Sequence, residues 1–249
     1  KGNDFSQTNL AAADQATDTP TNNFAVINPL ENFYSNATFA EGNCLQISAV
    51  TSSPATAPAP NISTIGVSSG KWYTEIKFVS KAEHDYGRPG ITSVQHLGPG
   101  GTINNPMGYL PNSYGMFFNS GSLYDGNGDV ATSYGSTIHV GDIVGVYMDL
   151  DNNKLYFSDN GTLVSSTGIS ITAPASTVLG AYFFGNTDES RNTATFAWNF
   201  GGCPAFAISS GNADANGYGN FEYDPSAGDF DGASKDFLAL CTKNLAEEG

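Results

Sequence analysis

Hydrophobic and polar positions alternate most regularly between residues 141 and 161. Four apolar side chains fall on one face of an expected strand, because successive strand residues point to opposite sides. They are Val144, Val146, Met148 and Leu150. Turn-forming residues follow, with Asp-Asn-Asn at 151–153 and Asn-Gly at 160–161. The pattern predicts a β-hairpin with one face against a core.

The same alternation returns elsewhere along the chain. Between residues 69 and 78, Trp72, Ile76 and Phe78 share one side, which predicts a half-buried strand. Shorter strands are expected at 38–39, 45–47, 114–118, 122–124, 178–184, 195–201 and 237–241. Both tryptophans, Trp72 and Trp198, are expected in the core. Turn-forming residues dominate 84–113, which predicts long loops, and the Pro-, Ala- and Ser-rich run 51–60 predicts a surface loop.

Composition supports a chain that is β throughout. Only 13% of the 249 residues are charged and 29 are glycine, which suits short strands and tight turns better than amphipathic helices. A chain of this length can form one large sandwich. The three cysteines, Cys44, Cys203 and Cys241, are widely spaced. We therefore expect buried free thiols instead of a disulfide framework or a metal site.

Charge and hydropathy exclude two classes of partner. Lys and Arg total 9 against 24 Asp and Glu, a formal net charge of −15. Most of the surface then repels phosphate, so nucleic acid is not an expected partner. No segment approaches the ~18 uninterrupted apolar residues of a membrane span. Membrane insertion is not expected either.

Two groups of acidic residues are candidate sites. Asp149 and Asp151 lie two residues apart, as a glycosidase pair could, but a hairpin turn explains them better. Asp125, Asn127 and Asp129 resemble the opening of a calcium loop without its later ligands, so a Gly-rich hairpin tip is favoured and the calcium site is the alternative. His84, His96 and His139 accompany no catalytic or metal-binding motif. Neither a catalytic centre nor a cofactor is expected.

Aromatic residues near the long loops are the better candidates for binding. Exposed tyrosines and an arginine are the residue types that stack on sugar rings or anchor interfaces. Ordinary packing under the loops is the alternative. The predicted ligand-binding residues are Tyr86, Arg88, Tyr109, Tyr114 and Tyr124.

Four segments resemble the SPRY family, in the family's order along the chain. They are 70–75 (Gly-Lys-Trp-Tyr-Thr-Glu), 114–117 (Tyr-Gly-Met-Phe), the hairpin 141–161 and 196–201, which ends in Asn-Phe-Gly. The resemblance implies a bent antiparallel β-sandwich of the concanavalin A-like kind, whose end loops bind a peptide or other ligand without enzymatic activity. We expect an irregular N-terminal extension at 1–61, the SPRY-like sandwich at 62–201 and a Gly/Asp-rich extension at 202–249 that packs on it.

The flanks resemble a narrower group, the SPRY-containing structural proteins of tailed bacteriophages, especially marine ones. The segments concerned are 1–5, 18–22, 28–30, 219–225 and 237–245. This resemblance implies a virion component, and a tail-fibre or appendage module that binds a host-surface glycan or protein. It also implies other virion subunits as partners and, by analogy with phage fibres, a homotrimer. The start at Lys1, without methionine, favours a piece of a longer protein.

Two alternatives remain open beside the tail-fibre hypothesis. One is a capsid decoration or fibre-shaft subunit that contacts only other virion proteins and binds no receptor. The other is a polysaccharide-degrading enzyme on the same kind of sandwich. The enzyme would need converging acids, which the sequence does not offer, so it ranks last.

Overall fold

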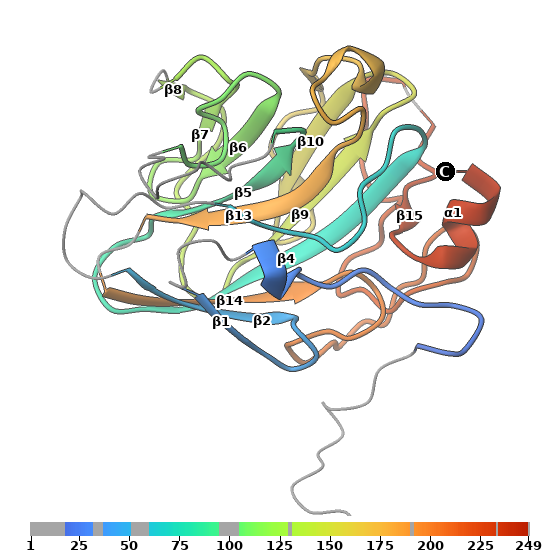
Figure 1. Cartoon of the computed structure of the whole chain (residues 1–249), viewed down its shortest axis with the longest axis horizontal. Helices are drawn as coiled ribbons and strands as arrows, with labels where there is room; N and C mark the ends of the chain where they lie inside the picture. Colours follow the sequence, from blue (N-terminus) through green and yellow to red (C-terminus); the bar gives the residue numbers. More distant parts are fainter. Residues whose placement is uncertain are drawn as a thin grey trace, which may run out of the picture.

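The computed structural model describes residues 18–31, 37–50, 60–94, 105–128, 131–189, 192–232 and 234–248. Two sheets, antiparallel apart from one short parallel pair, pack against each other (Figure 1). The first has the order β1-β2-β14-β4-β9-β10-β11 and the second the order β3-β13-β5-β6-β7-β8. The prediction of an all-β antiparallel sandwich is confirmed. None of the described helices has the length and apolarity needed to span a membrane.

The strands of the first sheet are β1 (Ala37–Ala40), β2 (Leu45–Val50), β4 (Lys71–Lys81), β9 (Ile143–Asp149), β10 (Lys154–Asp159), β11 (Thr162–Leu163) and β14 (Asn192–Asn199), with β12 (Ile169–Ser170) beside β10 and β15 (Leu238–Ala239) beside β4. Those of the second are β3 (Asn61–Ile62), β5 (Gly87–Thr92), β6 (Ser113–Phe117), β7 (Ser122–Tyr124), β8 (Ala131–Thr132) and β13 (Phe183–Asp188). The helical elements are η2 (Pro29–Glu31), η3 (Pro174–Ser176) and α1 (Thr242–Glu248).

The main core lies between the two sheets and is rich in aromatic rings. Phe78 of β4 stacks on Phe196 of β14 at 5.4 Å between ring centroids, and Phe118 lies 5.3 Å from Phe78. Trp72 and Trp198 have no exposed surface, as expected. Burial of such large apolar side chains is the main stabilising contribution to a sandwich of this size.

Strand β9 and residues 72–76 of β4 are buried on both faces, so the prediction of a half-buried strand is wrong for that part of β4. The second face carries Tyr73 and Tyr147, and aromatic residues of the C-terminal extension cover it. Phe221 lies edge-on to Tyr73 at 5.0 Å, and Phe237 lies edge-on to Tyr147 at 5.2 Å. The extension thus forms a second apolar layer, which Figure 1 shows in orange and red beside β4 and β9.

Several local expectations are met and others are corrected. The hairpin β9–β10 forms as predicted, with Tyr147 opposite Tyr156. The short strands expected near 38 and 45 are present as β1 and β2, and β2 pairs with β14, so the first sheet continues into the N-terminal segment. The strand expected from 178 begins only at Phe183, and Val178 is 77% exposed. The helix α1 was not predicted. Most of the loop at 51–60 lies outside the described residues.

A buried carboxylate joins the C-terminal extension to the sandwich. Glu75 of β4 is fully buried and accepts hydrogen bonds from the backbone N–H groups of Glu222 at 3.1 Å and Tyr223 at 2.8 Å. The Asn199 amide and the Tyr73 hydroxyl also donate to it, at 2.9 Å and 3.1 Å. Loss of solvation raises the pKa of Glu75, and these four donors oppose that effect in part.

A second carboxylate organises the extension internally. Asp214 is nearly buried and accepts hydrogen bonds from the backbone N–H of Ala239 at 2.8 Å and from the Asn244 side chain at 2.7 Å. Its other oxygen accepts from the backbone N–H of Tyr218 at 2.8 Å. Asp214 therefore links a turn of the extension to β15 and to the first turns of α1.

Replacing Glu75 by alanine is expected to lower the free energy of unfolding by about 3–5 kcal/mol, because it leaves buried N–H donors without an acceptor. Urea unfolding followed by tyrosine and tryptophan fluorescence measures the change. Glu83→Gln is the matched control, since the Glu83 side chain is 47% exposed. Equal effects of the two substitutions would show that Glu75 is not a structural anchor.

The same carboxylate predicts a dependence of stability on pH. Because the pKa of Glu75 in the folded protein lies above its ordinary value of 4.5, the folded state binds the proton more tightly than the unfolded chain. This tighter proton binding by Glu75 stabilises the folded protein in full below pH 4.5, and the stabilisation is lost as the pH rises through the pKa of Glu75 in the folded state. The unfolding free energy of the wild type minus that of Glu75→Gln should therefore fall over this range. A difference that rises or stays constant contradicts the assignment.

Candidate functional site

Arg88 lies on the outer face of the second sheet, at the centre of an aromatic cluster. Its neighbours in β5, Gly87 and Ile91, face the core, so the alternation of the strand turns Arg88 outward. The guanidinium carbon lies 3.8 Å from the ring centroid of Tyr124 and 4.9 Å from that of Phe117. The Arg88 side chain is nevertheless buried, because aromatic rings and a loop cover it.

Polar partners complete the surroundings of Arg88. Its Nη2 lies 2.7 Å from Oε1 of Glu189, which follows β13, and its Nη1 donates to the carbonyl of Met107 at 3.2 Å. The ring of Tyr109 lies 5.2 Å from the guanidinium. Guanidinium groups are favourable on aromatic faces, particularly where water is excluded. The Arg88 guanidinium therefore contacts three aromatic rings, those of Tyr109, Phe117 and Tyr124.

Partly exposed rings extend this cluster toward solvent. Tyr86 stacks on His84 with ring centroids 4.6 Å apart and an interplanar angle of 14°, and it contacts Phe117 at 5.2 Å. Tyr86, Tyr109 and Phe117 are each partly exposed. We call the set Tyr86, Tyr109, Phe117 and Tyr124 the aromatic surface. Tyr86, Tyr109 and Phe117 are its partly exposed members, whereas Tyr124 is buried and contacts Tyr109 and Phe117.

The local sequence explains how the loop 105–112 covers the sheet. Gly115 leaves room for the stem of Arg88, since a Cβ atom there would meet Arg88 Cγ at 2.9 Å. The Met107 N–H donates to Thr187 Oγ1 at 2.9 Å. At the tip after β7, the N–H of Gly126 donates to the Gly108 carbonyl at 2.7 Å and that of Gly128 to the Tyr109 carbonyl at 3.0 Å. The backbone of the loop around Tyr109 is thus bonded both to β13, through Thr187, and to the tip after β7.

The structure brings together four of the five predicted ligand-binding residues, namely Tyr86, Arg88, Tyr109 and Tyr124. Tyr114 is not among them: it faces the core from β6, and its hydroxyl accepts a hydrogen bond from the Thr172 N–H at 3.0 Å. Arg88 was expected beside a loop with its side chain exposed, whereas it lies in β5 and is 1% exposed. Phe117 and Glu189 were missed. Alternation with Tyr114 along β6 could have placed Phe117 on the outer face.

The possible calcium loop is described only in part. Asp125 and Asn127 are exposed, and Asp129 lies outside the described residues. In the part of the chain that the structure describes, no group of three or more His, Cys, Asp or Glu residues could hold a metal ion. The backbone bonds of Gly126 and Gly128 show what this tip does structurally, which is to hold the loop that carries Tyr109.

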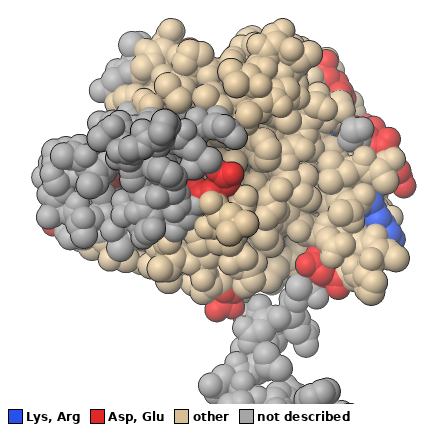
Figure 2. All heavy atoms as spheres, viewed as in Figure 1, with Lys and Arg blue, Asp and Glu red and all other residues tan. Residues whose placement is uncertain are grey.

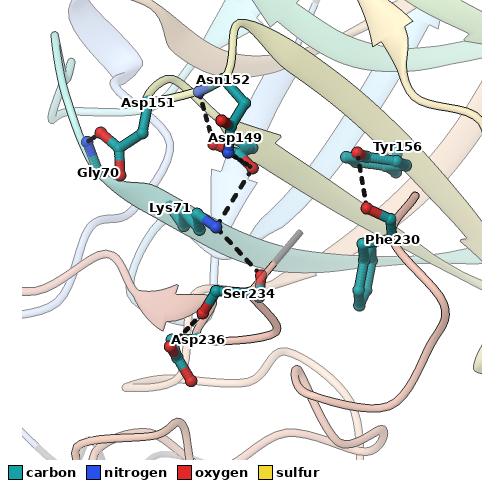
Figure 3. A network of polar contacts seen from close by, with 9 residues as sticks. All are labelled: Gly70, Lys71, Asp149, Asp151, Asn152, Tyr156, Phe230, Ser234 and Asp236. Atoms are coloured by element: carbon teal, nitrogen blue, oxygen red, sulfur yellow. Dashed lines mark hydrogen bonds and ion pairs between the residues drawn. The ribbon is translucent and has the colours of Figure 1, made fainter. Parts of the chain in front are cut away.

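A polar network surrounds Lys71 at the start of β4, where Lys71 is paired with Asp149 at the end of β9 (Figure 3). Lys71 Nζ lies 3.4 Å from Asp149 Oδ2 and donates to the Ser234 carbonyl at 3.1 Å. Asp149 also accepts from the N–H of Asn152 at 3.0 Å, and Asp151 accepts from the Gly70 N–H at 2.8 Å. Asp149 thus stabilises the turn of the β9–β10 hairpin, as the hairpin interpretation expects, whereas the Asp151 side chain binds the start of β4.

A cavity of about 550 Å³ opens beside this network. Its walls include Lys71, Asp151, Asn216, Asp236 and Glu248. Several of these groups already bind each other or the backbone: Asp236 accepts from the Ser234 hydroxyl, and Asp151 holds Gly70. The cavity is polar, and the C-terminal extension closes one side of it.

Comparison with known proteins finds partial similarities. No family model matches the chain. It is 32% identical over 103 residues to "Ran-binding protein 9" of Homo sapiens, which is 41% of this chain and 13% of that protein. It is 30% identical over 94 residues to "Ran-binding proteins 9/10 homolog" of Drosophila melanogaster, 38% of this chain and 9% of that protein. The matched segment thus spans about a tenth of the length of these relatives.

Solved structures also resemble the chain. The SPRY domain of human HERC1 aligns over 69% of this chain and 94% of its own, with a TM-score of 0.46 and 15% sequence identity. A second human SPRY domain aligns over 66% of this chain and 94% of its own, with a TM-score of 0.47 and 16% identity. In sequence, the similarity to the curated relatives is confined to about two fifths of this chain.

Proposed function

We propose that this chain is a SPRY-like binding module that holds its partner through the aromatic surface. The observation that carries the proposal is the packing of Arg88 beneath the rings of Tyr109, Phe117 and Tyr124. Rings that are fixed before binding lose little conformational freedom on association. Tyrosine and arginine are also the residue types that contribute most at interfaces.

The charge distribution agrees with an uncharged or weakly polar ligand. The face shown in Figure 2 consists mostly of side chains that are neither acidic nor basic, and Asp and Glu lie mainly toward its edge. The formal charge of −15 opposes approach of a phosphate backbone. A glycan or a protein surface suits a chain of this charge better than nucleic acid.

The SPRY assignment rests on two likenesses in sequence. The first is the order of the four sequence segments, which coincide with β4, β6, the β9–β10 hairpin and β14. The second is the sequence similarity to Ran-binding protein 9, which covers 41% of this chain. A binding role also agrees with the contacts of the two acids that a glycosidase would need. Asp149 is bound to Lys71 and to the Asn152 N–H, and Asp151 is bound to the Gly70 N–H.

The biological setting that we propose is a virion. The flanking segments resemble structural proteins of tailed phages, and on that resemblance the chain is a module of a tail fibre or appendage. Its partner is then a glycan or protein of the host surface, and its neighbours are other virion subunits, with a homotrimer as the expected assembly. A capsid decoration or fibre-shaft subunit is the competing role.

Truncating the aromatic surface should abolish most receptor binding. We expect Tyr86→Ala and Tyr109→Ala each to weaken saturable binding of the labelled protein to host cells by about tenfold or more, because partly exposed aromatic anchors dominate interfaces. Tyr218→Ala is the matched control, since this partly exposed tyrosine lies in the C-terminal extension. Pretreating cells with periodate or with protease separates a glycan receptor from a protein receptor.

The outcome distinguishes the two virion roles. Binding that the Tyr86 and Tyr109 variants retain in full would exclude the aromatic surface as the receptor site. Absence of cell binding by the folded wild type, together with incorporation into particles, would favour the structural subunit.

We expect Arg88 to contribute to binding indirectly, by stabilising the folded protein. Arg88→Ala should lower the free energy of unfolding by about 2–3 kcal/mol, because it removes charge-assisted hydrogen bonds and the cation–π contacts. Arg88→Lys should lose part of this, since an ammonium cannot stack as a planar group. Urea unfolding measures both. Lys77→Ala is the control: its ammonium lies 5.6 Å from one ring, that of Phe206, and a change within about 0.5 kcal/mol is expected.

A further inference from the structure

Two cysteines that are far apart in the sequence meet at one end of the first sheet. Cys44 directly precedes β2 and is fully buried, and Cys203 follows β14 and is partly exposed. The two strands are neighbours, with Leu45 opposite Ala197. The carbonyl of Cys44 also accepts the N–H of Trp198 at 2.7 Å. The topology of the sheet therefore places the cysteines together.

The turn between β1 and β2 contacts the sulfur atom of Cys203. Its residues Glu41, Gly42 and Asn43 have positive φ angles of 47°, 62° and 66°. The carbonyl of Glu41 accepts the N–H of Cys44 at 3.0 Å and lies 3.6 Å from Sγ of Cys203. A Cβ atom on Gly42 would lie 3.2 Å from the same sulfur. The tight turn thus makes room for the Cys203 thiol beside Cys44.

The side chains of Cys44 and Cys203 are in hydrogen-bond contact. The hydrogen bond with Cys203 is the larger cause, and burial the second cause, of the raised pKa of the Cys44 thiol. Of the two, Cys203 is the one that a reagent in solution can reach, because Cys44 has no exposed surface. The third cysteine, Cys241, is buried in the other apolar cluster, near Phe237 and Phe221.

We propose that Cys44 and Cys203 form a reversible disulfide when the folded protein meets a low-molecular-weight disulfide such as oxidised glutathione. The Cys203 thiolate attacks one sulfur of the oxidant, whose S–S bond breaks and releases one thiolate. The Cys44 sulfur then loses its proton and attacks Cys203, which forms the new S–S bond and expels the second thiolate. The two protein thiols together lose two electrons and two protons. The small disulfide gains them and becomes two thiols.

The bond would tie the turn before β2 to the segment after β14. It closes a long loop of the chain, and a cross-link of this kind stabilises chiefly by restricting the unfolded state. On the proposed virion role, the protein leaves a reducing cell interior for an oxidising medium, where such a bond persists. That consequence rests on the proposed function, whereas formation of the bond does not.

The test is oxidation of the purified folded chain in glutathione buffers of increasing oxidised fraction. Peptide mapping under non-reducing conditions should recover a peptide that joins Cys44 to Cys203, and the midpoint of thermal unfolding should rise by about 5 °C or more. Reduction with dithiothreitol should reverse both changes. Cys203→Ser, at the partly exposed position, should remove the cross-linked peptide and the shift, and Cys241→Ser should retain them.

Two results would overturn the inference. One is recovery of both cysteines as alkylated thiols after oxidation of the folded wild type. The other is a stable mixed disulfide at Cys203 that Cys44 does not resolve. Neither result depends on receptor binding, so failure here and failure of the proposed function are distinguishable.

Discussion

Burial of β4 on both faces is the constraint on which the rest of the molecule depends. One face of the strand packs into the core between the sheets, and the other holds Tyr73 and Glu75 against the C-terminal extension. A buried carboxylate is unfavourable unless donors surround it. The extension supplies two backbone N–H groups, from Glu222 and Tyr223, so the sandwich and the extension satisfy each other's polar groups.

The buried guanidinium of Arg88 has the corresponding role on the second sheet. Arg88 is turned away from the core, and a loop and several aromatic rings exclude water from its guanidinium. Glu75 is covered by backbone donors and makes an internal layer, whereas Arg88 is covered by Tyr109, Phe117 and their neighbours and supports an outer surface. The rings that remain partly exposed are therefore held in place before any partner arrives, which is the property that a binding surface needs.

Sequence patterns predicted the strands well and the burial of their second faces poorly. The β9–β10 hairpin follows from alternation and from turn residues, both of which are local. Alternation cannot say what covers the face that carries Tyr73 and Tyr147, since Phe221 and Phe237 come from a Gly- and Asp-rich region without a strand pattern. The contact between Cys44 and Cys203 is equally invisible in the sequence, because it depends on β2 and β14 becoming neighbours. Four predicted site residues did converge, although Arg88 supports the surface instead of reaching solvent.

The two candidate sites differ in whether a ligand must displace existing polar contacts within the protein. In the network of Figure 3, Lys71 is bound to Asp149 and Ser234, and Asp151 to Gly70, so a ligand in the cavity must compete with existing interactions. Displacing a charged group that is already paired costs desolvation without a compensating gain. The aromatic surface requires no such exchange, because both terminal nitrogens of Arg88 are already bound, Nη2 to Glu189 and Nη1 to the Met107 carbonyl, while Tyr86, Tyr109 and Phe117 present apolar area. Binding there removes water from rings that are already rigid, and this difference favours the aromatic surface as the site of recognition.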